Sequence, residues 1–243
     1  MAAFGALGLV IFQGALGGMR VLLDERFLAL LHGCVGPIFF AYLAGLIVVT
    51  SRRWDRAEEL SWPANSKLLR SAWITTGMVY LQLVLGAVMR HVPLGAAPSL
   101  FRGVLLCHLV LAIGITFHVL TLAVRAAHLP IEAKGYRGLG WLVAVLLGIQ
   151  LLLGLATYVV KYAFPAWLGE FAFAAGYVVQ EKSWWQSLIT TGHVANGSLI
   201  LFAATMMSVR ATLQFSPREV DRTVSRSGNS IASQLILAQW RAA

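Results

Sequence analysis

The stretch GVLLCHLVLAIGITFHVLTLAV, residues 103–124, contains no Asp, Glu, Lys or Arg side chain. The hydrocarbon core of a bilayer is about 30 Å thick, and an α-helix needs roughly 20 apolar residues to cross it. Lipid offers no hydrogen-bond partner to the backbone, so a run of this length is typical of a transmembrane helix and excludes a strand.

Five further uncharged runs lie on either side of this one. The six runs together are 3–19, 27–50, 71–89, 103–124, 138–160 and 186–209. Of the 243 residues, 58% are hydrophobic and 12% are charged, against about 25% charged in soluble domains. The sequence therefore predicts an all-α polytopic membrane helix bundle, with six transmembrane helices arranged as three helical hairpins in a lipid bilayer.

The distribution of Lys and Arg predicts the orientation. Loops 51–70 and 125–137 together with the tail after residue 209 hold 13 of these residues, and the opposite side holds 6. By the positive-inside rule, both termini are expected in the cytoplasm. The net charge of +9 forms no continuous basic face, so nucleic acid is not an expected partner.

The two ends of the chain carry no clear targeting signal. The first run has no basic segment before it and no small-residue cleavage signature after it, so we interpret it as a span. Since no presequence is visible, a bacterial cytoplasmic membrane is favoured over a mitochondrial inner membrane. Residues 210–243 are expected to form a cytoplasmic tail. From Ser216 onward we expect it to be mostly disordered, with a surface helix at Ile231–Trp240 as the alternative.

One sequence pattern occurs three times. Spans one, three and five carry Gln-x-x-Leu-Gly, and the helix after each carries a His near its outer end; the motifs begin at Gln13, Gln82 and Gln150, and the histidines are His32, His108 and His193. A single Gln and Gly one turn apart on a membrane helix usually serve helix packing. Three copies in register, each followed by a His-bearing helix, favour a binding role.

The three histidines are candidate metal ligands. Ionisable side chains inside a membrane are costly and often functional, although a lone His is more often a hydrogen-bonded packing residue. Zinc fits poorly, because no carboxylate or Cys cluster shares the expected depth. Haem fits better, because its iron takes two axial imidazoles. On this interpretation Arg20 and Arg90 could pair the propionates, with His91 beside them, or could simply extend to water.

Two points stay open at the level of the residues. His118 lies deeper on the same helix as His108 and is the rival ligand. Two histidines complete one haem, so the third has no mate within these three hairpins.

The sequence resembles the haem A synthase family of cytochrome oxidase assembly. The likeness rests on the Gln-x-x-Leu-Gly helices, on Leu-Gly-Ala-Val-Met-Arg-His at 85–91 and on the following His-bearing helices. Residues 13–40, 71–125 and 140–209 look like the third and fourth, the fifth and sixth, and the last two of that family's eight helices. The resemblance implies a pseudo-symmetric protein with a substrate haem in one half and a haem B cofactor in the other.

The resemblance also implies roles for individual residues. His108 and His193 match the haem B ligands, and His32 matches one of two histidines at the haem O substrate site. The expected organisation is residues 1–50 as the remaining half of the substrate unit and 71–209 as the haem B unit. The implied reaction oxidises the haem O C8 methyl group to a formyl group, with water as the oxygen source, and needs an external electron acceptor.

The sequence departs from the family at two places. The family's first helix pair, with its substrate-site His and a functionally important Glu, has no counterpart, and residues 92–106 lack the Cys that many members carry. A separate helix pair or a second copy of the chain could complete the site. The alternative is a b-type haem protein for binding or electron transfer, and a colourless bundle is the least favoured reading.

Overall fold

The computed structural model describes residues 2–51, 66–93, 95–129 and 134–215, and these form helices and their connections, with no strand among them. Six helices are long and apolar enough to cross a membrane. Their bounds are α1 Ala2–Leu22, α2 Arg26–Thr50, α4 Ser66–Arg90, α5 Pro98–Ala127, α6 Lys134–Tyr162 and α8 Trp184–Phe215. The predicted polytopic helix bundle is confirmed, and the chain is a multi-pass membrane protein.

The helices extend beyond the uncharged runs at most of their ends. α4 continues through Arg90 and α6 through Lys161 to Tyr162, because long basic side chains reach the membrane surface while their backbone stays helical. α8 continues to Phe215, so residues 210–215 prolong the last helix. The remaining tail, including the possible surface helix at 231–240, lies outside the described residues.

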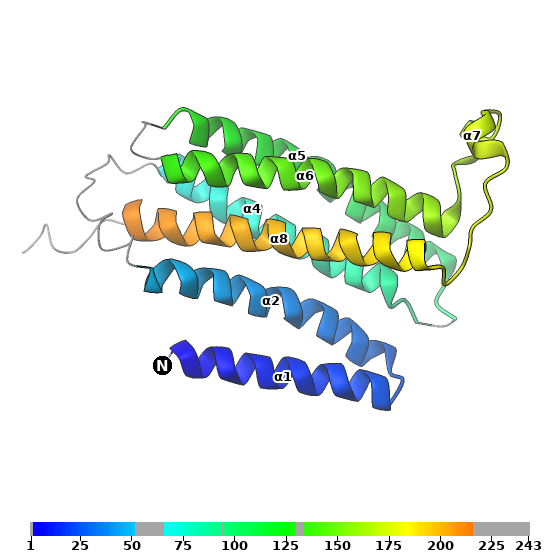
Figure 1. Ribbon diagram of the computed structural model, residues 1–243, viewed down its shortest axis with the longest axis horizontal. Coiled ribbons are helices and arrows are strands. Elements are labelled where there is room, and N and C mark those ends of the chain that lie inside the picture. Colours follow the sequence, from blue (N-terminus) through cyan, green and yellow to red (C-terminus); the bar gives the residue numbers. More distant parts are fainter. Residues whose placement is uncertain (1, 52–65, 94, 130–133, 216–243) are drawn as a thin grey trace, which may run out of the picture.

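Three connections at one end of the bundle reverse the chain; two are short, and the third, between α6 and α8, contains a 3-10 turn at Ala166–Leu168 and the short helix α7 Ala172–Ala175. Asp24, between α1 and α2, has a φ of 50°, a left-handed conformation that Asp tolerates better than most residues. Pro98 stands at the start of α5, where the absence of its N–H costs nothing. We call this end, which is predicted to face away from the cytoplasm, the outer end. α1 begins and α8 ends at the opposite end (Figure 1).

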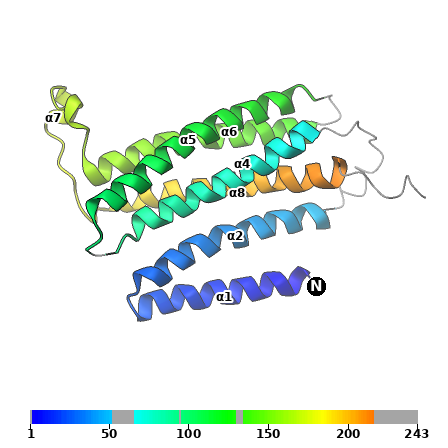
Figure 2. The same ribbon diagram turned by 180° about the vertical axis from the view of Figure 1, so that it is seen from behind.

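Four of the six helices form a ring of contacts. α4 packs on α5 and α8, and α6 packs on α5 and α8. α2 packs on α8 and α4 from outside this ring, and α1 makes its extensive contacts with α2 alone. Figures 1 and 2 show α1 as the outermost layer of the molecule from both sides. The first hairpin is therefore attached to the four-helix ring through one helix.

The ring is held together by two groups of buried side chains. One group includes Leu68, Leu122 and Met207 and lies near the end opposite the outer end, which we call the inner end. The other group lies nearer the middle and includes Val119 and Leu201. Hydroxyl groups supplement this packing at the contact of α4 with α8, where Thr76 Oγ1 and Ser208 Oγ lie 2.9 Å apart. This combination is typical of membrane bundles, where close van der Waals contact and interhelical hydrogen bonds replace the hydrophobic effect.

Candidate functional site

Each motif glycine faces the histidine of the following helix. A methyl group built on the glycine would lie 3.0, 3.6 and 3.2 Å from the imidazole Cε1 in the three copies, the pairs being Gly17–His32, Gly86–His108 and Gly154–His193. The three hairpins are therefore structural repeats as well as sequence repeats. A residue without a side chain is used where an imidazole ring must lie against the neighbouring helix.

In the first two copies, the motif glutamine holds the backbone of the histidine. Gln13 Nε2 donates to the carbonyl oxygen of His32 at 2.9 Å, and Gln82 Nε2 donates to that of His108 at 3.0 Å. Both bonds join the two helices of a hairpin at the level of the histidine. They fix the height of each His-bearing helix against its partner.

The third copy uses its glutamine differently. Asn196 Nδ2 donates to Gln150 Oε1 at 2.8 Å and to the carbonyl oxygen of Leu146 at 2.9 Å. Gln150 Nε2 in turn lies 3.4 Å from Nε2 of His193. Asn196 is buried and was not among the residues predicted from the sequence. Its position three residues after His193 inside a membrane span was the available signal.

A backbone hydrogen bond fixes the tautomer of His32. Its Nδ1 lies 3.2 Å from the carbonyl oxygen of Gln13. A carbonyl only accepts hydrogen bonds, so Nδ1 carries the proton and Nε2 keeps its lone pair. Metal-binding histidines are commonly oriented by such a bond from the nitrogen that does not bind the metal. The contact with Gln13 therefore occupies Nδ1 of His32 and not Nε2.

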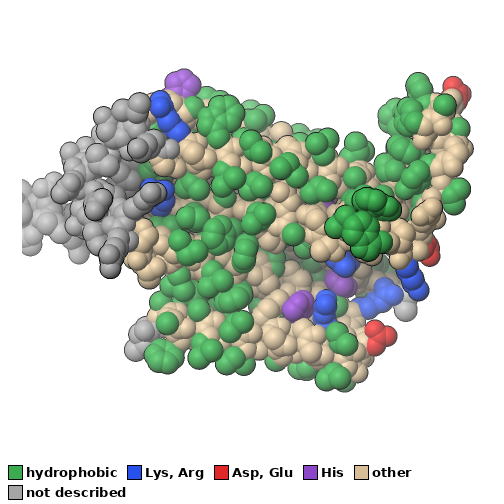
Figure 3. All heavy atoms as spheres, in the orientation of Figure 1, with side chains coloured by type: hydrophobic (Ala, Val, Ile, Leu, Met, Phe, Trp, Pro, Cys, Tyr) green, Lys and Arg blue, Asp and Glu red, His purple; other side chains and the backbone are tan. Residues whose placement is uncertain are grey.

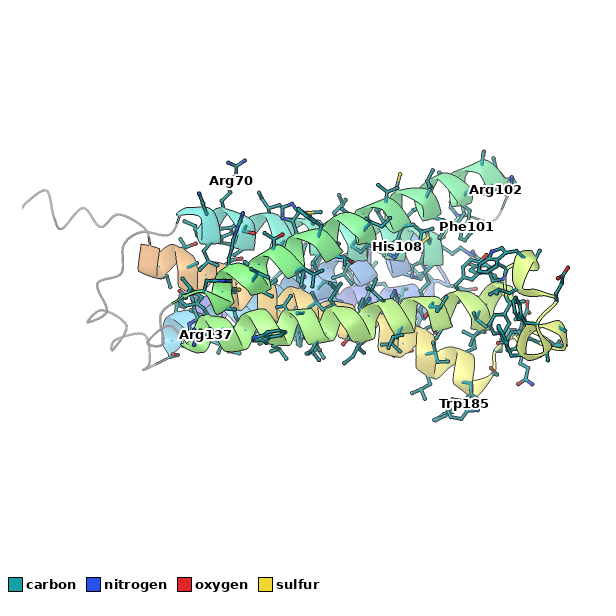
Figure 4. All side chains as sticks on the ribbon, turned by 90° about the horizontal axis from the view of Figure 1, so that it is seen from above. Arg70, Phe101, Arg102, His108, Arg137 and Trp185 are labelled. Carbon is teal, nitrogen blue, oxygen red and sulfur yellow. The ribbon has the colours of Figure 1, made fainter. Side chains whose placement is uncertain are left out.

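His108 and His193 lie close enough together for a charge on one to act on the other. His108 is ten residues from the start of α5 and His193 nine from the start of α8, whereas His32 is six from the start of α2. Figure 4 shows His108 on the outer half of α5, between Arg102 at the outer end and the level of Arg137 at the other. These two histidines therefore lie near each other, at nearly the same distance from the starts of their helices.

The donor chemistry of this pair fits an iron porphyrin. Nδ1 of His108 and Nδ1 of His193 are buried without a hydrogen-bond partner among the described residues, and unpartnered buried nitrogens are costly unless something compensates them. Two imidazoles are sufficient protein ligands for haem iron. Within the described residues, no three His, Cys, Asp or Glu side chains gather as ligands for a bare metal ion.

Basic side chains surround His91 at the outer end. Burial lowers the pKa of His91 below its usual value, and the charges of Arg90, Arg20, Arg26 and Lys161 lower this pKa further. The structure thus brings together the three predicted residues of this region and adds Arg26 and Lys161. From the sequence, Arg26 and Lys161 are predicted only to lie on the outer side. Their approach to His91 depends on how four helices pack together.

The remaining candidate residues lie apart from the histidine pair. His118 is ten residues, or about 15 Å, further along α5, and its ring lies edge-on to that of Phe117 at 6.2 Å. A shallow pocket occurs at the inner end, beside Lys67, Arg125 and His128. It is separated from His108 by most of the length of α5, so the histidines and not this pocket define the candidate site.

Fold and site together define a class: a multi-pass membrane helix bundle with repeated hairpins and two histidines near each other in its outer half. Comparisons of the chain with family models, with curated proteins and with solved structures found no match.

Proposed function

We propose that this chain is a haem-binding membrane oxidoreductase of the haem A synthase type, with haem B held between His108 and His193. The observation that carries this proposal is the approach of these two imidazoles on equivalent helices, each against a motif glycine. Two imidazoles so placed would hold the iron of a haem between the two helices. A binding role for the histidines also explains the threefold repeat of the hairpin better than helix packing alone does.

In this proposal, each part of the repeat has a task. Gly86 and Gly154 give the rings room beside the neighbouring helix, and the glutamines hold the His-bearing helices at a fixed height. Bound haem B would supply one-electron redox chemistry, and an external acceptor would take the electrons. The apolar helices around the pair would keep water from the iron.

His32 is assigned to the haem O substrate. Its protonated Nδ1 leaves Nε2 available for iron, and its hairpin has the same construction as the two that hold haem B. A second ligand for this haem would come from a further helix pair or from a second copy of the chain. The proposed reaction oxidises the haem O C8 methyl group to a formyl group, with the oxygen atom taken from water and with four electrons and four protons released, the electrons passing to the external acceptor.

A second candidate function is a b-type haem protein without this oxidation chemistry. It is favoured by one observation: the structure brings His108 and His193 together, whereas both hydrogen bonds of the His32 region are made within its own hairpin. Such a protein would carry electrons through one haem and would need no substrate site.

Expression with added haem O, followed by purification and pigment extraction, separates these functions. A reduced-minus-oxidised spectrum of low-spin haem together with newly formed haem A supports the synthase. Haem B without haem A supports the electron-transfer protein. A colourless preparation after reconstitution with haem contradicts both.

Substitution of single histidines tests the ligand assignment. His108→Ala and His193→Ala should each abolish the low-spin spectrum, because each removes one axial ligand. His118→Ala, on the same helix as His108, is the matched control and should retain the spectrum. His32→Ala should leave haem B in place and affect only bound haem O. Loss of the spectrum in His118→Ala with retention in His108→Ala would reassign the ligand.

A further inference from the structure

Four cations from four different helices meet at the outer end of the bundle. Arg20 lies in the last turn of α1, Arg90 in that of α4 and Lys161 in that of α6, while Arg26 is the first residue of α2. All four act electrostatically on His91, and Arg90 also acts on Lys161. We call these five residues the outer basic cluster. Figure 3 shows Lys, Arg and His side chains gathered in the hollow between the α1–α2 pair and the other helices.

The cluster lies just above the histidines. Arg20 follows Gly17 by three residues, Arg90 follows Gly86 by four and Lys161 follows Gly154 by seven, which is one to two helical turns toward the outer end. Since each of these glycines faces a histidine ring, the cations stand above both the His32 hairpin and the His108–His193 pair. The cluster therefore connects the two halves of the molecule.

A hydrogen bond braces the middle of the cluster. Arg26 Nη1 donates to the carbonyl oxygen of Val92 at 3.0 Å, which ties the start of α2 to the segment just after α4. His91, in that segment, is half-buried, while the four cations are exposed. The arrangement is thus a partly enclosed base with accessible positive charges around it.

Helix ends and snorkelling account for some of these charges, since cations near a helix C-terminus are favourable. They do not account for the convergence. All four charged groups that lower the pKa of His91 are cations. Like charges brought together are unfavourable unless an anion joins them. A ligand with more than one negative charge would relieve the repulsion.

We infer that the outer basic cluster is a carboxylate-binding site shared by the two halves of the protein, with Lys161 and Arg26 as binding residues beside Arg90 and Arg20. The inference rests on the proposed function, because the carboxylates in question are the propionates of porphyrins held by the histidines below. Arg90 and Lys161 serve the His108–His193 side, and Arg20 and Arg26 serve the His32 side. An anionic lipid headgroup offers related chemistry and is separated from this case by experiment.

Titration of the full-length chain with two porphyrins tests the inference. The chain, in neutral detergent, is titrated with haem B and with haem B dimethyl ester, in which both carboxylates are blocked, and binding is followed by absorbance. The wild type should bind the free acid at least about tenfold more tightly, as expected for charge-assisted contacts. Added salt should reduce this preference, since exposed charges are screened.

Substitutions then identify the residues. Lys161→Gln and Arg90→Gln should each reduce the preference for the free acid at least severalfold, while binding of the ester stays unchanged. Arg102→Gln is the matched control, because Arg102 is an exposed cation on α5 at the same end and lies outside the cluster; this variant should keep the full preference. Arg26→Gln should act in the same way on haem O bound to a variant that carries both His108→Ala and His193→Ala, where His32 is the remaining proposed ligand.

The outcomes separate the inference from the function on which it rests. Equal binding of acid and ester by the wild type overturns the carboxylate site and leaves haem binding intact. Failure to bind either porphyrin overturns the proposed function itself. If only phosphatidylglycerol retention, measured by lipid extraction from nanodiscs, falls in Lys161→Gln and Arg90→Gln, the cluster binds lipid headgroups and the inference is wrong.

Discussion

At the scale of single residues, the close approach of glycine to histidine is the feature of the repeat that leaves the least space for a side chain. A methyl group on Gly86 would make an ordinary contact with His108 at 3.6 Å, whereas on Gly154 it would lie 3.2 Å and on Gly17 3.0 Å from the facing ring. The three copies therefore differ in tolerance. The third and first copies have no spare room, while the second can accept a small side chain.

Gly154→Ala should weaken haem binding by about 10- to 100-fold, the range found when the support of a metal ligand is disturbed. The added methyl group would lie too close to the imidazole of His193 and would force this ring to shift. Gly148→Ala, on the same helix, is the matched control, since nothing lies within 4 Å of its methyl position. It should keep haem and gain a little stability from the better helix propensity of Ala. Equal haem affinity in both variants, measured by titration, would contradict this reading.

His91 predicts a specific pH dependence of stability. Its pKa is lowered in the folded protein by burial and by the surrounding cations Arg90, Arg20, Arg26 and Lys161, while in the unfolded chain it is about 6.5. The unfolded state therefore binds this proton first as the pH falls. Stability should be complete above about pH 6.5 and decline below it until the folded pKa is passed.

Thermal unfolding in detergent between pH 5 and 8 checks this prediction. His91→Gln should remove part of the acid-side decline in melting temperature, because the titrating group is gone. Lys161→Gln should reduce the decline as well, since one of the cations that oppose protonation is lost. An unchanged pH profile in both variants would contradict the electrostatic account.

At the scale of elements, the contact of α6 with α8 depends on one buried amide. Asn196 joins α8 to two residues of α6, whereas the first copy of the repeat carries Val35 and the second Leu111 at the equivalent position. In these copies Gln13 Oε1 and Gln82 Oε1 are buried without a partner among the described residues. The third copy is thus the one in which the glutamine is fully restrained.

Asn196→Val, which copies the first repeat, should destabilise the protein by about 1–2 kcal/mol, because two interhelical hydrogen bonds are lost and Gln150 Oε1 is left buried without a partner. Ser198→Ala is the control, since Ser198 bonds within its own helix to Val194 and should change stability little. Unfolding in a denaturing detergent measures both. A larger effect of Ser198→Ala would exclude the assigned role.

At the scale of the whole molecule, the ring of α4, α5, α6 and α8 is the unit that holds the histidine pair. Its four helices close on themselves through their own contacts, and α1–α2 lies outside. A chain lacking residues 1–65 should therefore still bind one haem through His108 and His193, with an unchanged low-spin spectrum. His193→Ala in the shortened chain should abolish that spectrum. A colourless shortened chain beside a pigmented full-length one would show that α2 is required for the site.

Much of this architecture can be predicted from the sequence. Each uncharged run predicts one helix, and the repeated motif predicts how two successive helices form a hairpin. The facing of Gly17 with His32, for example, is implied by one motif on one helix and one residue on the next. The convergence of Arg26 and Lys161 on His91, and the reach of Asn196 to Gln150, depend on how separate hairpins rotate against each other. The rotation of each helix about its own axis decides which neighbour its side chains meet. This rotation depends on packing between hairpins and cannot be read from a single uncharged run.

The reliance of α2 on α8 has a consequence for biogenesis. α2 is translated before its main partner α8, which follows α4, α5 and α6 in the chain. Before α8 is inserted, Gln13 and His32 can make their two hydrogen bonds with each other inside the hairpin. Because these bonds are internal to the hairpin, we expect α1–α2 to be tolerated in the bilayer before α8 is inserted beside it.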